Sequence, residues 1–196
     1  MTISEDQIQG AVPPGVYELG PATATLTVKT GRQGMAARAG HDLVLDVTQW
    51  NGSLVIDPDS SRSELSVTVD AGSLEIRDAV GGVKPLTADD RTEIRRNIAD
   101  KVLHVGKNPA ITFASTAVKH TNDRTLAVAG NLAIAGVTRP VQFDVTLAPG
   151  GNSAVLRATV TIAQSKFGIR PFSALMGTLK VADNVEITGE ARLQVD

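Results

Sequence analysis

Cysteine is absent from the 196 residues of this chain. This absence excludes disulfide bonds, zinc sites built on thiolates and thiol catalysis, and it is consistent with a reducing compartment. Aromatic residues make up only 3% of the sequence, so the interior must consist mainly of Val, Leu, Ile and Ala. Hydrophobic residues make up 42%, which is enough for the core of a single domain of this length.

The chain also lacks an excess of either charge and any long apolar run. It carries 19 basic and 21 acidic residues, a net charge of −2. Proteins that bind nucleic acid neutralise phosphates with surplus Lys and Arg, so no nucleic-acid partner is expected. No stretch approaches the roughly 18 apolar residues of a membrane-spanning helix, so no stable membrane insertion is expected. The first residues lack the basic and apolar regions of a secretory signal, which predicts a cytoplasmic protein.

Apolar and polar residues alternate along most of the chain. Such runs occupy residues 25–29, 43–48, 65–70, 111–114, 126–134, 141–147, 156–162 and 185–195. A period of two residues is typical of a β-strand with one buried face. Asn51-Gly52, between two of these runs, predicts a hairpin. The long strands and the absence of a strand–helix rhythm favour an all-β, antiparallel, up-and-down barrel of about eight strands.

One segment follows a helical period instead. Between Thr87 and Leu103, Ile94, Ile98 and Val102 recur at helical spacing, and Thr87 is suited to cap the first turn. The sequence therefore predicts one amphipathic helix that packs on the barrel as a lid or a brace. Residues 1–14 are predicted to form a flexible tail, and residues 15–196 a single barrel domain.

Several motifs, in order along the chain, resemble those of the YceI-like, polyisoprenoid-binding proteins. The residues that carry the resemblance are NPAITFAST (108–116), GNLAIAGVTRPVQFDV (130–145), SKFGI (165–169) and DNVEITGEA (183–191). GVYELGPATATLTVKT (15–30) lies where the family's opening strand is expected. Each motif is weak alone, but their common order and spacing over residues 15–196 make the resemblance specific. Gln164 departs from the family pattern, which often has Arg at this position.

The resemblance implies an extended, lipocalin-like barrel with a long apolar pocket for an isoprenoid chain of the polyprenyl or quinone type. The protein is then expected to bind a hydrophobic or amphiphilic small molecule without catalysis, for carriage, storage or sequestration. No cofactor other than a bound isoprenoid lipid is expected, and a homodimer is left open. The residues expected to line the pocket are Leu45, Val47, Phe113, Leu132, Ile134, Phe143, Val145, Leu156, Val160, Ile162 and Phe167, with Arg38 and His41 as polar contacts at the rim.

Two alternatives remain open on the sequence alone. The same alternation fits a barrel whose interior is filled, with Trp50, Phe167 and Phe172 as the plug, in an interaction or structural module. An enzyme acting on a lipid-like substrate would instead need His41 or Asp42 to point inward. Adjacent residues on a strand face opposite sides, so these two are not expected to act together. The three histidines lack metal-ligand spacing, and no metal site or catalytic residue is predicted.

Overall fold

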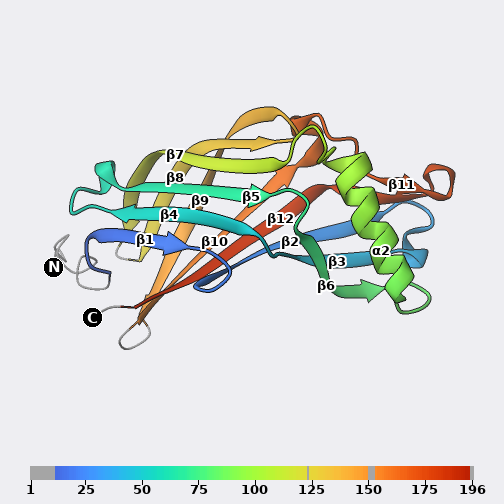
Figure 1. Cartoon of the computed structure of the whole chain (residues 1–196), viewed down its shortest axis with the longest axis horizontal. Coiled ribbons are helices and arrows are strands. Elements are labelled where there is room, and N and C mark those ends of the chain that lie inside the picture. Colours follow the sequence, from blue (N-terminus) through green and yellow to red (C-terminus); the bar gives the residue numbers. More distant parts are fainter. Residues whose placement is uncertain (1–11, 123, 150–152, 195–196) are drawn as a thin grey trace.

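The computed structural model describes residues 12–122, 124–149 and 153–194 and consists mainly of β-strands with one α-helix (Figure 1). The helix α2 spans Ala88–Asn97 and continues as one wider helical turn over Ile98–Val102. The strands are β1 (Gly15–Leu19), β2 (Ala24–Gln33), β3 (His41–Val47), β4 (Trp50–Ile56), β5 (Glu64–Asp70), β6 (Leu74–Gly81), β7 (Ala110–Asn122), β8 (Thr125–Ile134), β9 (Val137–Pro149), β10 (Ser153–Ala163), β11 (Ser173–Ala174) and β12 (Leu179–Gln194).

All of these strands belong to one antiparallel sheet, in the order β1-β4-β5-β7-β8-β9-β10-β12-β2-β3-β6, with β11 beside β12. Strand β3 leads directly into β4, and β5 into β6. Because β3 pairs with β6 and β4 with β5, these four strands form one long, bent, two-stranded ribbon. One part of the ribbon pairs with β2 and the other with β7, so the ribbon closes the sheet into a barrel.

The sheet has twelve strands rather than about eight because the bend divides two ring positions, into β3–β4 and β5–β6, and because two short strands, β1 and β11, pair with β4 and β12 outside the ring. Counted around the ring, there are eight positions: β2, β3–β4, β5–β6, β7, β8, β9, β10 and β12. These positions follow the order of the chain, which is the up-and-down arrangement that the sequence predicts. The lipocalin-like antiparallel barrel with one helix is therefore confirmed.

The bend in the ribbon is held by backbone and side-chain hydrogen bonds. The Thr48 amide donates to the Ser73 carbonyl at 3.1 Å, and the Asp70 amide donates to the Gln49 carbonyl at 3.0 Å. The buried Ser73 hydroxyl donates to the Gln49 and Asp70 carbonyls at 3.2 and 2.8 Å. The backbone groups at the bend thus keep partners even though the strands change direction there.

The predicted hairpin at Asn51-Gly52 is wrong. Both residues lie within β4, where Gly52 pairs with Val67 on one side and Leu19 on the other. A Cβ atom at Gly52 would lie 2.7 Å from the Ser66 carbonyl oxygen. Gly52 therefore permits the close approach of a neighbouring strand and does not form a turn. The dipeptide Asn-Gly alone cannot distinguish these two roles of glycine.

The predicted helix is confirmed, and its cap is the one expected. Thr87 accepts a hydrogen bond from the Asp90 amide, while the Asp90 carboxylate accepts one from the Thr87 amide, which forms a capping box. Arg91 donates to the Ile76 carbonyl at 3.0 Å and Arg95 pairs with Glu75 at 2.5 Å, so the helix is attached to β6. Within the described ranges, no helix combines the length and the apolar character needed to cross a membrane.

The predicted N-terminal tail, residues 1–14, falls mostly outside the described residues, which begin at Val12. Val12 itself is buried in the core, and the Tyr17 hydroxyl donates to the Pro13 carbonyl at 2.7 Å. The chain is therefore in contact with the barrel before β1 begins.

Removing the Ser73 hydroxyl tests the bend. We expect Ser73→Ala to lower the free energy of unfolding by about 1 kcal/mol and Tm by about 2–4 °C, because a buried hydrogen bond that the hydroxyl shares between two carbonyls is lost. Thermal and urea denaturation measure the effect. Ser66→Ala, at an exposed position on β5, is the matched control and is expected to change little. Equal effects at both positions would contradict a special role for the bend.

Candidate ligand-binding site

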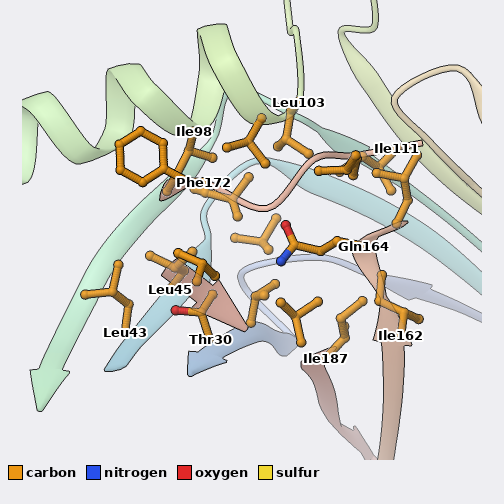
Figure 2. A pocket seen from close by; sticks show the side chains of 18 of the residues that line it. Thr30, Leu43, Leu45, Ile98, Leu103, Ile111, Ile162, Gln164, Phe172 and Ile187 are labelled. Carbon is orange, nitrogen blue, oxygen red and sulfur yellow. The ribbon is translucent and has the colours of Figure 1, made fainter. Parts of the chain in front are cut away.

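The barrel encloses an apolar cavity of about 500 Å³, here called the main cavity. Its walls come from β2, β3, β5, β7, β8, β9, β10 and β12 and from the helical segment α2 to Leu103. Inward-facing aliphatic side chains dominate the lining, because every strand turns its apolar face to the interior. Figure 2 shows these side chains converging on one space from the strands below and the helix above.

The structure brings most of the residues expected in the pocket to this cavity. Those that line it are Leu45, Val47, Phe113, Leu132, Ile134, Phe143, Val160 and Ile162. Phe113 and Phe143 also contact each other, with ring centroids 5.3 Å apart. Val145 and Leu156 instead line a second cavity, and Phe167 is buried in the core without lining either one.

The second cavity, of about 180 Å³, lies toward the other end of the barrel. It adjoins the main cavity, since five residues line both: Leu26, Leu65, Val67, Ala158 and Gly189. Ala158 and Gly189 lie directly opposite each other on β10 and β12. We call this place the waist, because the two cavities meet here beside Ala158, whose side chain is a methyl group, and Gly189, which has no side chain.

Helix α2 and the chain after β10 form one wall that sequence reasoning did not assign to the pocket. Ile94, Ile98 and Val102, the apolar face of the predicted helix, all line the main cavity. Phe172 lies beneath the helix beside Ile98 (Figure 2), and the Lys101 ammonium lies 5.9 Å from the centre of its ring. The helix is therefore both a brace on β6 and part of the wall of the cavity.

Gln164, at the end of β10, is one of the polar residues that line the main cavity, together with Thr30, Asn97 and Thr112. It continues the inward register of Leu156, Ala158, Val160 and Ile162, but it carries an amide. The side chain is 7% exposed, and its Nε2 donates to the Ala182 carbonyl at 2.9 Å. This bond assigns the amide orientation and leaves Oε1 without a donor among the described residues (Figure 2). Oε1 is thus available to a hydrogen-bond donor on a ligand.

One end of the main cavity, here called the mouth, is lined by Ala39, Gly40, His41, Ala174, Leu179 and Lys180, of which Ala39 and Lys180 are exposed at the surface. Of the two predicted rim contacts, His41 lines the cavity and Arg38 does not. The His41 Nε2 lies 3.0 Å from the Lys84 carbonyl.

The charged neighbours of His41 serve the structure of the mouth. Arg32 donates to the Gly40 carbonyl at 2.5 Å and to the Val80 carbonyl at 3.2 Å. Asp42, the residue after His41, accepts a 2.8 Å hydrogen bond from the Arg32 amide. His41 and Asp42 therefore bind separate backbone and side-chain partners, and they do not contact each other as an acid–base pair would.

The turn that positions Gln164 is fixed by its neighbour. The Ser165 hydroxyl and amide donate to the Asp183 carboxylate at 2.6 and 2.7 Å. These hydrogen bonds, the side-chain one foremost, hold the pKa of the Asp183 carboxyl below its usual range, because they favour the charged form. The end of β10 is thereby attached to β12 beside the cavity.

The described residues contain no cluster of His, Asp or Glu that could hold a metal ion. The aromatic plug of the filled-barrel alternative is also not formed. Phe172 is in the wall of the main cavity, Trp50 is in the wall of the second, and Phe167 packs in the core. The Trp50 Nε1 is buried without a hydrogen-bond acceptor in the described part of the chain.

The ring of strands and its internal cavity define a lipocalin-like antiparallel barrel of the ligand-binding type. Within this class, the model of the YceI-like domain matches residues 17–193. The chain therefore belongs to the YceI-like family, which confirms the resemblance found in its motifs.

Relatives in Pseudomonas share part of the sequence. A UPF0312 protein of Pseudomonas putida (strain W619) is 40% identical over 90 residues, which are 43% of this chain and 47% of that protein. A UPF0312 protein of Pseudomonas paraeruginosa (strain PA7) is 31% identical over 128 residues, which are 62% of this chain and 60% of that protein. The chain thus spans about half the length of the first of these relatives.

Two solved structures resemble the whole barrel. BcnA of Burkholderia cenocepacia gives a TM-score of 0.67 at 16% identity, covering 87% of this chain and 96% of that one. A polyisoprenoid binding domain from Saccharophagus degradans, implicated in plant cell wall breakdown, gives 0.60 at 9% identity, covering 93% and 99%. At these identities the likeness concerns the fold alone.

The bonds between Ser165 and Asp183 predict a pH dependence. A carboxyl whose pKa is lowered by folding stabilises the protein above its unfolded pKa, near 3.8, and loses this effect as the pH falls through the folded value. We expect Asp183→Asn to lower Tm at pH 7, and the difference from wild type to shrink below about pH 4. Asp144→Asn, an exposed change on β9, is the control. A difference in Tm that stays constant down to pH 3 would contradict the assignment.

Proposed function

We propose that this protein binds a long-chain isoprenoid of the polyprenyl or quinone type, or a similar amphiphilic lipid, in the barrel interior. It holds the molecule without transforming it, for carriage, storage or sequestration. The observation that carries the proposal is the open apolar main cavity, whose size is within the roughly 300–1,000 Å³ typical of small-molecule sites. The YceI-like family and the polyisoprenoid binding domain of similar fold support the choice of ligand class.

Burial of the chain supplies the binding energy. Each methylene moved from water into an apolar interior contributes roughly 0.8 kcal/mol, so a few isoprene units suffice for tight binding without polar contacts. In this proposal a branched, flexible chain passes the waist and also occupies the second cavity, which shares five lining residues with the main one. Affinity then depends on chain length more than on the identity of the polar end.

The polar end lies toward the mouth in this proposal. Away from the mouth the lining of the main cavity is mainly aliphatic and aromatic, with Thr30, Asn97, Thr112 and Gln164 as its polar residues, whereas the charged or titratable residues His41, Lys180 and Arg32 lie toward the mouth. The Gln164 Oε1 suits a hydroxyl or another neutral donor, since an amide oxygen accepts hydrogen bonds and repels anions. The ligand is therefore oriented with its tail toward the waist.

A charge in the main cavity tests the site directly. We expect Phe143→Asp to reduce the affinity for a polyprenol at least about 100-fold, because a carboxylate there meets apolar side chains and the ligand tail. The matched control is Gln142→Asp, the exposed neighbour on β9, which is expected to bind as wild type does. Circular dichroism establishes that both variants fold. A folded Phe143→Asp protein with unchanged affinity would contradict the site.

Chain-length dependence tests the waist. Ala158→Phe fills the space opposite Gly189, so we expect long prenols to lose about tenfold in affinity while prenols short enough for the main cavity keep theirs. Titration with a series of prenols of increasing length measures this. Thr161→Phe, exposed on the same strand, is the control. A loss that is equal for every chain length would contradict a tail that passes the waist.

A further inference from the structure

The exposed apolar side chains are concentrated at one end of the barrel. Six large apolar residues are exposed in the described part of the chain, and only Val16, on β1, is away from the mouth. The other five are Met35, Val80, Val83, Leu175 and Met176. Val80 pairs with Asp42 next to His41, so it belongs to the mouth as well. Exposed apolar groups gathered in one place mark an interaction site rather than random surface.

The three residues Met35, Leu175 and Met176 occupy the tips of two neighbouring loops, here called the apolar tips. The loops connect β2 to β3 and β11 to β12, and the Ala36 amide joins them by donating to the Thr178 carbonyl at 3.0 Å. Gly34, at a φ of 101°, lies against the same carbonyl, where no side chain would fit. The two tips are therefore held side by side, at the end of the barrel where β11 lies (Figure 1). Ala39, Ala174 and Leu179, which flank the two tips in the sequence, line the main cavity.

The conformation of the second tip keeps its side chains in solvent. Leu175 and Met176 have φ values of 50° and 53°, in the left-handed region that is unfavourable for both residue types. The Thr178 hydroxyl donates to the Leu175 carbonyl at 2.7 Å and holds the turn. Met35 is 93% exposed and Met176 is 104% exposed. We take a strained turn that presents methionine to water as a sign of a contact outside the protein.

The charge of the two loops indicates what that contact is. On and around the two loops, residues 31–42 and 170–183 contain Arg32, Arg38, Arg170 and Lys180 and two acidic residues, Asp42 and Asp183. Asp42 lies 3.7 Å from the Arg32 guanidinium, and Asp183 accepts hydrogen bonds from Ser165. The ion pairs of the described residues involve none of Arg38, Arg170 and Lys180, so these three cations are the charge available to a partner. Arg38 and Lys180 are exposed beside the tips. Apolar side chains flanked by cations match an anionic lipid surface, where the apolar groups enter the acyl region and the cations meet phosphates.

We infer that the mouth docks on an anionic lipid surface through the apolar tips, so that the ligand passes between bilayer and barrel without crossing water. This inference rests on the proposed function, because an isoprenoid that leaves a bilayer through water loses the burial of every methylene. Docking places the mouth against the membrane and the main cavity behind it. The tips thus set the rate of loading and release, while the cavity sets the affinity.

Vesicle binding tests the docking surface. The triple variant Met35→Ser, Leu175→Ser, Met176→Ser is compared with wild type by co-sedimentation with phosphatidylcholine vesicles that contain about one quarter phosphatidylglycerol. We expect binding to fall at least about tenfold in the triple variant. Val16→Ser, which removes an exposed apolar residue far from the mouth, is the matched control and is expected to bind as wild type does. Circular dichroism checks the fold of each protein.

A transfer assay separates docking from ligand binding. A fluorescent derivative of geranylgeraniol is offered either from the same vesicles or from dilute ethanol. The inference requires that the triple variant takes up the probe more slowly from vesicles but reaches the wild-type affinity from ethanol. If the wild-type protein does not bind the vesicles, the inference is wrong. This result is expected if the apolar tips bind another protein instead of a lipid surface. In a further outcome, neither the wild type nor the variants bind the probe, and the triple variant alone loses vesicle binding. This outcome supports docking and contradicts the proposed ligand class.

Discussion

Closure of the barrel at the bent ribbon is the constraint on which the rest of the structure depends. Strands β3–β4 and β5–β6 pair along their whole length only because Thr48, Gln49, Asp70 and Ser73 exchange hydrogen bonds where both strands change direction. Without that junction the sheet would have two free edges, and its apolar face would meet water. With it, a single sheet encloses a space that its own short side chains do not fill. The interior contains a cavity because few aromatic side chains are available to fill it and because the residues at the waist are small.

The helix complements this arrangement. It follows β6, whose one partner strand among the described residues is β3, and it is attached there by Arg91 and Arg95, while Ile94 and Ile98 line the main cavity. The barrel is therefore closed by backbone pairing around most of its circumference and by side-chain packing beside β6. Both cavities are mainly apolar, and charged or titratable side chains line each of them: His41, Arg32 and Lys180 in the main cavity, and Asp57, Arg124 and Glu190 in the second. The ends of the molecule differ in their exposed apolar side chains, because the apolar tips lie at the mouth.

Much of the barrel, the helix and the cavity lining could be predicted from the sequence, as individual residues show. Alternation identified the inward faces because side chains along a strand point to opposite sides, and Thr87 with Asp90 identified the start of the helix. Alternation cannot say how far along the barrel a residue lies, so Val145 and Leu156 belong to the second cavity. Phe167 belongs to a turn after β10 and follows no strand period. The wall formed by Ile98 and Phe172 depends on long-range packing that no local pattern contains.

Gln164 could also have been predicted from the sequence, since it continues the inward register of β10 and differs from the common residue of the family.

The central claim is that this protein carries an isoprenoid in its interior. The most direct test is native mass spectrometry of the purified protein, followed by organic extraction and lipid mass analysis. We predict one isoprenoid molecule per chain, released by the organic solvent. A protein that is empty on purification, and remains empty after exposure to quinones and polyprenols, would contradict the account.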